Sequence, residues 1–102
     1  MIVEYIRYRV PTDPAAFEAA YARASTSLRE APQCLAYELT RCEEAPDHYI
    51  LRIEWLSTEA HLQGFRHGPQ FGPFLSEIRP YVAQIEEMRH YAPTGLTWRR
   101  DA

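Results

Sequence analysis

Few of the features that mark familiar functional sites occur in this sequence. The chain has two cysteines in 102 residues, no apolar run of membrane-spanning length, and a formal net charge of −3 with scattered arginines. Because a basic stripe and a long apolar segment are both missing, we expect no nucleic-acid partner and no membrane partner. A glycine-rich phosphate loop, a serine-triad order and a flavin fingerprint are missing as well.

The two cysteines indicate neither a disulfide nor a metal site. Cys34 and Cys42 fall in one predicted strand, which would hold them roughly 26 Å apart and so prevent a disulfide. Neither has the spacing of a metal or redox motif, so we expect reduced thiols. The start of the chain, MIVEYIRYRV, is too short and too charged for a signal peptide. These features lead us to expect a cytoplasmic protein.

What is present is the composition of one globular domain. Hydrophobic residues make up 46% of the chain, charged residues 25% and aromatic residues 13%. A chain of this length builds one hydrophobic core. The aromatic content fits either a ligand cavity or an ordinary core filling.

The first third of the chain predicts a strand and a helix. Residues 2–10 are rich in β-branched and aromatic types, which favours a strand. Asp13 followed by Pro14 supplies a capping carboxylate and a proline at the first helical position. An apolar stripe at helical spacing then runs towards Glu30. Its members are Phe17, Ala20, Tyr21, Ala24 and Leu28.

The rest of the chain predicts a hairpin, helical segments and a last strand. Residues 34–42 and 48–55 alternate cleanly and are joined by the polar segment 43–47. Ser57 can cap a helix, and 82–91 reads as a strand. The two predicted helical segments carry Ala60, His61, Gly64 and Phe65, and then Phe71, Phe74, Leu75 and Ile78 before Pro80.

The resulting order, β-α-β-β-α-β, predicts an α+β fold of the ferredoxin-like type. Its four strands would form one antiparallel sheet with the helices on one face. We expect this domain to span residues 1–92 and to be followed by a tail, 93–102. The tail contains Trp98, and the sequence leaves open whether it crosses onto a second protomer or is disordered.

The strand alternation assigns residues to two sheet faces. The face expected beneath the helices carries Leu35, Tyr37, Leu39, Tyr49, Leu51, Ile53 and Trp55. The other face carries Ala36, Glu38, Thr40, Ile50, Arg52 and Glu54. Pairing this mixed face with a copy of itself would bury Ile50 and let Arg52 meet an acid of the neighbour, so we expect a sheet-to-sheet homodimer. A solvated outer face is the alternative.

These residues resemble the antibiotic biosynthesis monooxygenase (ABM) domain family. The resemblance rests on IVEYIRYRV, CLAYEL, the strand ending in W-x-S and the closing IEEMRHY, and it covers about residues 2–92. It implies a dimeric α+β barrel with a ligand cavity between helices and sheet in each protomer. It also implies oxygenase chemistry that uses no cofactor.

The resemblance directs attention to Trp55, which in such oxygenases helps to line the chamber. Anchoring the strand end beneath a helix is its alternative role. The family pattern has an asparagine four positions before the tryptophan and a tyrosine six positions after it, where this chain has Leu51 and His61. We expect His61 to act as base or hydrogen-bond donor. Trp55 would be the wall, with its indole N–H as a second donor.

The remaining pocket residues are expected to make an aromatic, apolar cavity suited to a planar ring. They are Tyr21, Tyr37, Leu51, Ile53, Phe65, His67, Phe71 and Phe74. Tyr37 is the expected secondary donor, and ordinary core packing is the alternative for most of the set.

The histidines do not predict a metal site. His61 and His67 are six residues apart, which does not place them on one helical face, so we expect no metal. The family resemblance implies that no cofactor is used. His90 is expected at a sheet edge or on the dimer side, and Glu86 and Glu87 on opposite faces. Haem-degrading relatives have an asparagine in the first strand and a tryptophan on the second helix, and this chain lacks both, with QGFR in the matching helix region. Haem binding would depend on His67, because it is the only nearby candidate for an iron ligand.

The leading hypothesis is a cofactor-independent monooxygenase. Its substrate would be a small activated aromatic, a hydroquinone or an anthrone-like polyketide, oxidised by dioxygen. The alternatives are a non-catalytic module that binds a small aromatic, a purely structural dimer and, more distantly, a haem-binding or haem-degrading protein. The sequence leaves the substrate and the occurrence of catalysis open.

Overall fold

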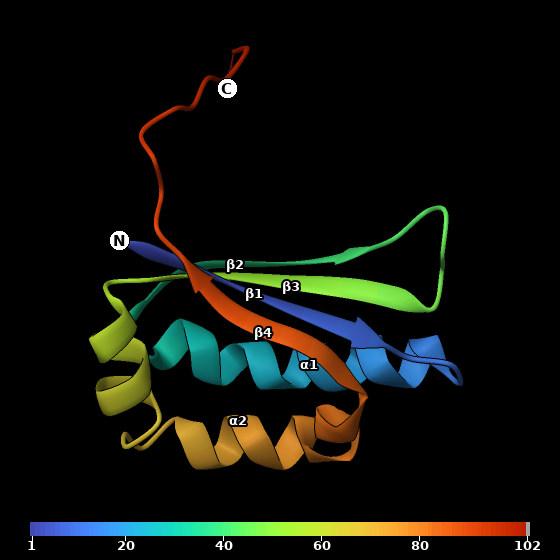
Figure 1. The fold of residues 1–102 in the computed structure, drawn as a ribbon. Helices are drawn as coiled ribbons and strands as arrows, with labels where there is room; N and C mark the ends of the chain where they lie inside the picture. Colours follow the sequence, from blue (N-terminus) through green and yellow to red (C-terminus); the bar gives the residue numbers. More distant parts are fainter. Residues whose placement is uncertain (102) are drawn as a thin grey trace.

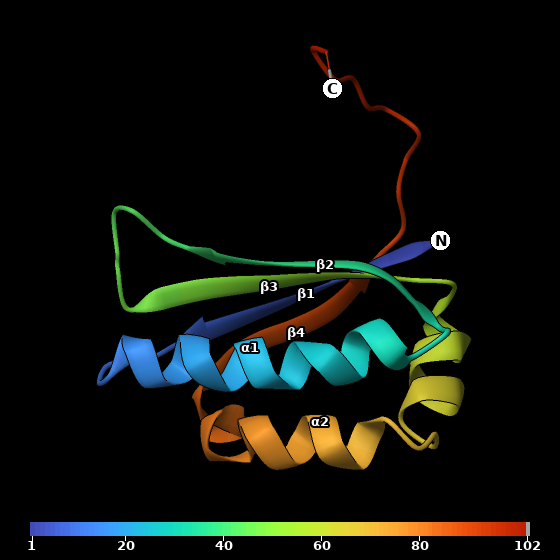
Figure 2. The same cartoon turned by 180° about the vertical axis from the view of Figure 1, so that it is seen from behind.

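The structure, a computed structural model, describes residues 1–101 and has the predicted ferredoxin-like α+β fold. The elements in chain order are β1 (Ile2–Arg9), α1 (Pro14–Glu30), β2 (Cys34–Arg41), β3 (His48–Trp55), the π-helical turn η1 (Ala60–Phe65), α2 (Phe71–Ile78), the 3₁₀ turn η2 (Arg79–Gln84) and β4 (Ile85–Tyr91). The strands form one antiparallel sheet of order β2-β3-β1-β4. Figures 1 and 2 show all helices on the same face of the sheet.

The first helix begins and packs as its sequence predicts. Asp13 caps it by accepting a hydrogen bond from the Ala16 backbone N–H at 3.1 Å, and Pro14 is the first helical residue. The predicted apolar stripe is buried against the sheet. The hydroxyl groups of Tyr8 and Tyr21 are hydrogen-bonded to each other, so α1 is held to β1 by a polar contact as well as by aromatic packing.

The two predicted sheet faces are largely confirmed, with one correction in β2. The inward-facing residues of β3 are all buried, as the alternation predicts. Leu35 was predicted to face the helices, but it is 50% exposed. A register shift between Cys34 and Ala36 places Cys34 opposite Trp55 and packs it against the core instead. The bulge adds one residue to the strand and so turns Leu35 outward.

The last strand starts later than predicted. Residues 82–84 belong to η2, and β4 begins only at Ile85. Pro80 lies at the start of this 3₁₀ turn, and the Ile85 backbone N–H closes it on the Val82 carbonyl. The apolar Val82 therefore lies in a turn over the helix-facing side rather than in the sheet.

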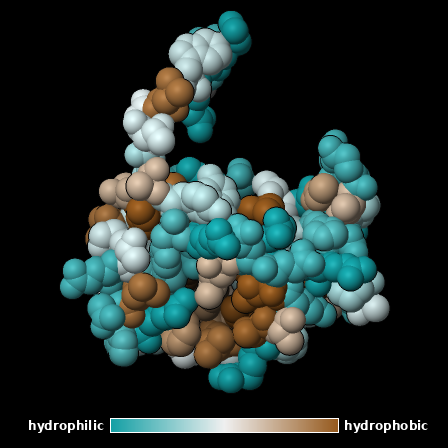
Figure 3. Space-filling view, viewed as in Figure 1, coloured by the Kyte–Doolittle hydropathy of each residue, from teal (hydrophilic) through white to brown (hydrophobic). Residues whose placement is uncertain are grey.

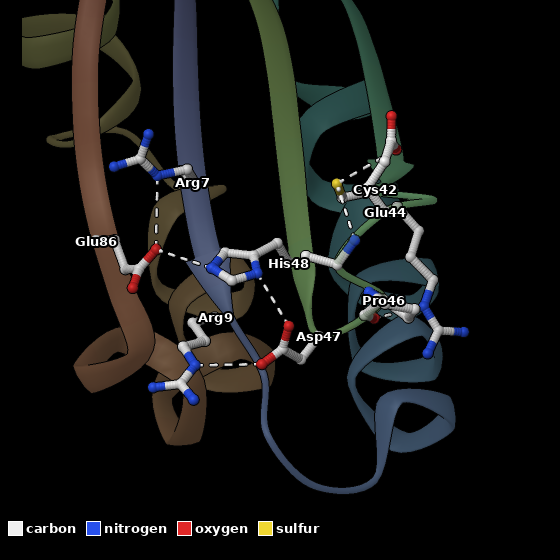
Figure 4. A network of polar contacts seen from close by, with 10 residues as sticks. Arg7, Arg9, Cys42, Glu44, Pro46, Asp47, His48 and Glu86 are labelled. Atoms are coloured by element: carbon white, nitrogen blue, oxygen red, sulfur yellow. Dashed lines mark hydrogen bonds and ion pairs between the residues drawn. The ribbon is translucent and has the colours of Figure 1, made fainter.

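A second bulge, in β4, corrects the expectation for its two glutamates. Arg7 lies opposite Glu87 in the register, but the shift after Arg7 brings Glu86 to the same guanidinium, at 3.5 Å, with Glu87 at 3.8 Å. Figure 4 shows the network that follows: Glu86 also faces His48 at 3.5 Å, and His48 bonds Asp47 at 2.9 Å. These side chains join β1, β3 and β4 outside the core.

The chain after β4 leaves the body of the domain on the side opposite the helices (Figures 1 and 2). Its apolar residues Leu96 and Trp98 are 93% and 73% exposed, and the Arg100 guanidinium stacks on the Trp98 ring at 4.6 Å. The last residue of the predicted tail, Ala102, lies outside the described residues. Within residues 1–101, none of the helices is long and apolar enough to cross a membrane.

Candidate functional site

A cavity of about 200 Å³ lies between the sheet and the segment from η1 to η2. Its walls are mainly apolar side chains of β1, β3, α2 and β4, and Figure 3 shows apolar atoms gathered in a recess between β4 and α2. The polar groups among its lining residues are few: Glu4, Tyr8, Trp55, His61 and Arg66. A mostly apolar cavity with a few converging polar groups is the usual form of a small-molecule site.

Glu4 is the buried acid of this cavity. The other helix-facing positions of β1 hold Ile2, Ile6 and Tyr8, so Glu4 is an acid in an otherwise apolar and aromatic row. It is only 1% exposed. The Trp55 indole N–H donates to Glu4 Oε1 at 3.0 Å, whereas Oε2 makes no hydrogen bond with the described residues. Burial raises the pKa of the Glu4 carboxyl, and the Trp55 hydrogen bond and the Arg66 charge offset only part of this effect.

His61 lies directly against Trp55. The two rings are stacked, with centroids 4.3 Å apart and planes at 10°, and His61 is 4% exposed. Its Nε2 is 3.8 Å from Glu4 Oε1. Burial, with repulsion from Arg66, lowers the pKa of His61 to about 3. The imidazole is therefore neutral at pH 7, which makes it a hydrogen-bond partner and a weak base.

His90 completes a chain of polar groups behind the cavity. It lies opposite Glu4 in the β1–β4 register, and its Nε2 is 2.7 Å from His61 Nδ1. Burial and the Arg66 charge lower its pKa. The predicted edge position is confirmed, because β4 is an edge strand of the sheet. The dimer-side alternative was wrong, because the His90 side chain points towards His61 and the helical layer, and the mixed polarity of IEEMRHY does not reveal which residues of β4 point inward.

The structure places the predicted site residues in three locations. Six line the cavity: Ile53, Trp55, His61, Phe65, Phe71 and Phe74. Three line a separate hollow of about 250 Å³ between α1 and the β2–β3 hairpin: Tyr21, Tyr37 and Leu51. His67 is exposed outside both, so no haem ligand comes from it to the cavity. The Trp55 N–H, expected to contact a ligand, is instead bonded to Glu4.

Sequence reasoning missed Glu4 and Arg66. The signal for Glu4 was a single acid at an inward position of an alternating apolar strand. Arg66 follows η1 directly, and its backbone N–H bonds the His61 carbonyl at 3.1 Å, which fixes it next to the site. The sequence around Arg66 gives no sign of a functional site, since one arginine after a helical turn is common on protein surfaces.

The polar groups at the cavity also form a potential cation site. Glu4, His61 and His90 each offer a ligand atom, and these atoms lie within 4.8 Å of one another. Two imidazoles and a carboxylate are a donor set that binds divalent transition metals.

Comparison with known proteins agrees with this architecture. Residues 1–76 match the family described as antibiotic biosynthesis monooxygenase. A crystal structure from Bordetella bronchiseptica whose name places it in this group is 27% identical, with 91% of this chain and 96% of that chain covered and a TM-score of 0.74. SnoaB, a cofactor-independent oxygenase from Streptomyces nogalater, shares the fold at 21% identity, with 93% and 95% covered and a TM-score of 0.72.

A Bacillus subtilis protein, YczJ, is 23% identical over 75 residues, which cover 74% of this chain and 79% of that protein. The family match spans β1 to most of α2 and includes Glu4, Trp55, His61 and Arg66. On this evidence the chain belongs to the antibiotic biosynthesis monooxygenase family.

Proposed function

We propose that this protein is a monooxygenase that oxidises a small activated aromatic with dioxygen and without a cofactor. Membership of the family supports the reaction class. SnoaB, which is a cofactor-independent oxygenase, has the same fold. The observation that carries the proposal is the unpartnered, buried Glu4 oxygen at an apolar cavity. The substrate must be one whose deprotonated form can reduce dioxygen, because the proposed reaction uses no cofactor.

The proposed reaction converts a substrate CH₂ carbon, in the keto form of the ring, to a carbonyl. The Glu4 carboxylate accepts one proton, and the electron pair left behind is delocalised as an enolate. The enolate passes an electron to dioxygen, and recombination of the radicals forms a C–O bond. The peroxide anion takes the proton back from Glu4, and loss of water then leaves the carbonyl, so one oxygen atom enters the product and the other leaves in water.

Glu4 is a better proton acceptor for this step than His61. A carboxylate with a raised pKa in an apolar site is a stronger base than an exposed one, which is the usual way an acid side chain becomes a general base. The lowered pKa of His61 makes it a weak base instead. We therefore assign His61 a positioning role: it stacks on Trp55, which holds Glu4 through its N–H.

The cavity favours a small substrate with an acidic oxygen. Its volume of about 200 Å³ is below the roughly 300–1,000 Å³ of typical ligand pockets, which favours a one-ring hydroquinone over a larger anthrone. The Arg66 guanidinium lies in the same wall and can stabilise the negative oxygen of the enolate. Phe65, Phe71 and Phe74 supply flat apolar contacts for the ring.

The test is oxygen uptake by chelator-treated protein with a panel of hydroquinones and anthrones. We expect Glu4→Gln to lower the rate of uptake about 100-fold or more, the scale of a lost general base. Glu43→Gln makes the same chemical change on an exposed hairpin residue and should leave the rate unchanged.

Two results would argue against the proposal. Uptake that persists in Glu4→Gln would remove Glu4 from the role of base. A compound from the panel that binds stoichiometrically but is recovered unaltered under air would instead support a non-catalytic binding module. Circular dichroism of each variant shows whether a lower rate comes from the missing carboxylate or from unfolding.

We also propose that two protomers pair through the open sheet face. That face carries Ile50 on the inner strand β3, and none of the helices described covers it (Figures 1 and 2). Arg52 pairs with Glu54 of its own strand at 2.5 Å, so the charges there are already partly neutralised within the protomer. The projecting tail, which carries the exposed Trp98, leaves the domain on the same side of the sheet (Figure 1).

A further inference from the structure

We infer that Glu4, His61 and His90 form a binding site for one divalent first-row transition-metal ion. This binding function goes beyond the proposed oxygenation, which uses no metal, and competes with it, because an ion held by Glu4 would occupy the carboxylate that serves as the base. The three residues come from β1, η1 and β4, so the site joins both neighbouring strands to the helical layer.

The geometry needs little adjustment to accept an ion. The candidate ligand atoms lie within 4.8 Å of one another, and two ligand atoms on one ion with bonds of about 2.0–2.2 Å are at most about 4.4 Å apart. His61 Nδ1 and His90 Nε2 are 2.7 Å apart, close to the separation of about 3 Å for neighbouring ligands around an octahedral ion with 2.1 Å bonds. An ion would replace the hydrogen bond between these nitrogens.

A second observation, on the Glu4 carboxylate, favours a ligand at this cluster. Glu4 Oε2 makes no hydrogen bond with any of residues 1–101, although Glu4 is 1% exposed. Buried carboxylate oxygens are paired or bound to metal in nearly all proteins, since an isolated one is costly. An ion coordinated by this oxygen would give it a partner.

The surroundings resemble the support that metal sites require. The Trp55 N–H holds Glu4 Oε1, which fixes the carboxylate and leaves Oε2 free. Glu4 and His61 line the cavity, and three protein ligands leave coordination positions of an ion open for water or a small ligand. Arg66 acts in the opposite sense, because its positive charge lies near all three residues.

Cobalt(II) and zinc(II) are the probes for this site. Protein without an affinity tag is stripped with chelator, desalted, and titrated with Co²⁺ by visible absorption and with Zn²⁺ by calorimetry. We expect one ion per chain and a cobalt spectrum of bound nitrogen ligands. His90→Gln and Glu4→Gln should each weaken binding at least tenfold, and Arg66→Gln should strengthen it because a nearby positive charge is removed.

The chain supplies its own matched controls. His48 and His67 lie outside the cluster, so His48→Gln and His67→Gln should bind the ion as tightly as the wild type. Equal affinity in wild type and His90→Gln, loss of binding in either control, or no stoichiometric binding in a folded wild type would overturn the inference. No substrate is needed for these measurements, so their result stands apart from the oxygen-uptake test.

Discussion

A single acid determines the character of this cavity. Most residues that line it are apolar or aromatic, and only Glu4 brings a carboxylate, held from one side by the Trp55 indole. A charged group that is buried and half satisfied costs folding free energy. Proteins retain such residues at functional sites, where local stability is exchanged for chemistry.

Glu4→Gln should therefore make the protein more stable while removing its proposed base. The glutamine amide oxygen can still accept the Trp55 hydrogen bond, but the neutral side chain avoids burying a charge. We expect a gain of about 1 kcal/mol in the free energy of unfolding at pH 7, measured by urea denaturation of metal-free protein. The exposed Glu43→Gln should change it little, and a less stable Glu4→Gln would mean that the carboxylate is better paired than its contacts indicate.

Among the elements, α1 depends on a cap with an unusual backbone. Asp13 has φ of 51°, in the left-handed region, and its side chain still accepts the Ala16 N–H. Aspartate and asparagine tolerate this region better than other side chains with a Cβ. Both the cap and the turn into Pro14 therefore favour a short acceptor side chain at this position.

Asp13→Ala should destabilise the protein by about 1–2 kcal/mol, because it removes a capping acceptor and puts alanine at positive φ. Asp13→Asn keeps the acceptor and should stay within about 0.5 kcal/mol of the wild type. Thermal and urea unfolding of the two variants give the comparison. Equal losses in both would show that the charge, rather than the hydrogen bond, is what matters.

The elements that the sequence predicted well are those with one clear period. The 48–55 strand and the 14–30 helix have unbroken alternation or spacing, and their bounds are those of β3 and α1. The exceptions are local: the bulge that exposes Leu35, the 3₁₀ turn that delays β4, and the bulge that brings Glu86 beside Arg7. Bulges add a residue without changing the composition, so alternation alone cannot locate them.

The candidate site was likewise predicted only where its residues follow a local sequence pattern. Trp55 and His61 are close in sequence and were predicted together, and they stack in the structure. Glu4 and His90 join them only through the register of β1 with its neighbours, which depends on the folded sheet. Long-range pairing of this kind leaves no spacing in the sequence, so a chemically important half of the cluster was missed.

At the scale of the whole molecule, the domain exposes more surface than its mass requires. Its accessible area is 6,695 Å², compared with about 5,900 Å² for a compact monomer of this mass. The uncovered sheet face and the projecting tail fit this excess. A stable association should bury about 1,000 Å² or more in total, and the two features lie on the same side of the domain.

The proposed dimer makes Ile50 the residue to change. It lies on the open face in β3, one of the two inner strands, so Ile50→Glu would place a negative charge at the interface of both protomers. We expect the wild type to sediment as a dimer at micromolar concentration and Ile50→Glu to sediment as a monomer. Ala19→Glu, on the exposed side of α1, adds the same charge away from the sheet and should remain dimeric.

A monomeric wild type, or dimers equally stable in both variants, would contradict sheet-to-sheet pairing. Because the cavity lies on the helix side, a folded Ile50→Glu monomer should keep its cobalt site, which separates assembly from metal binding.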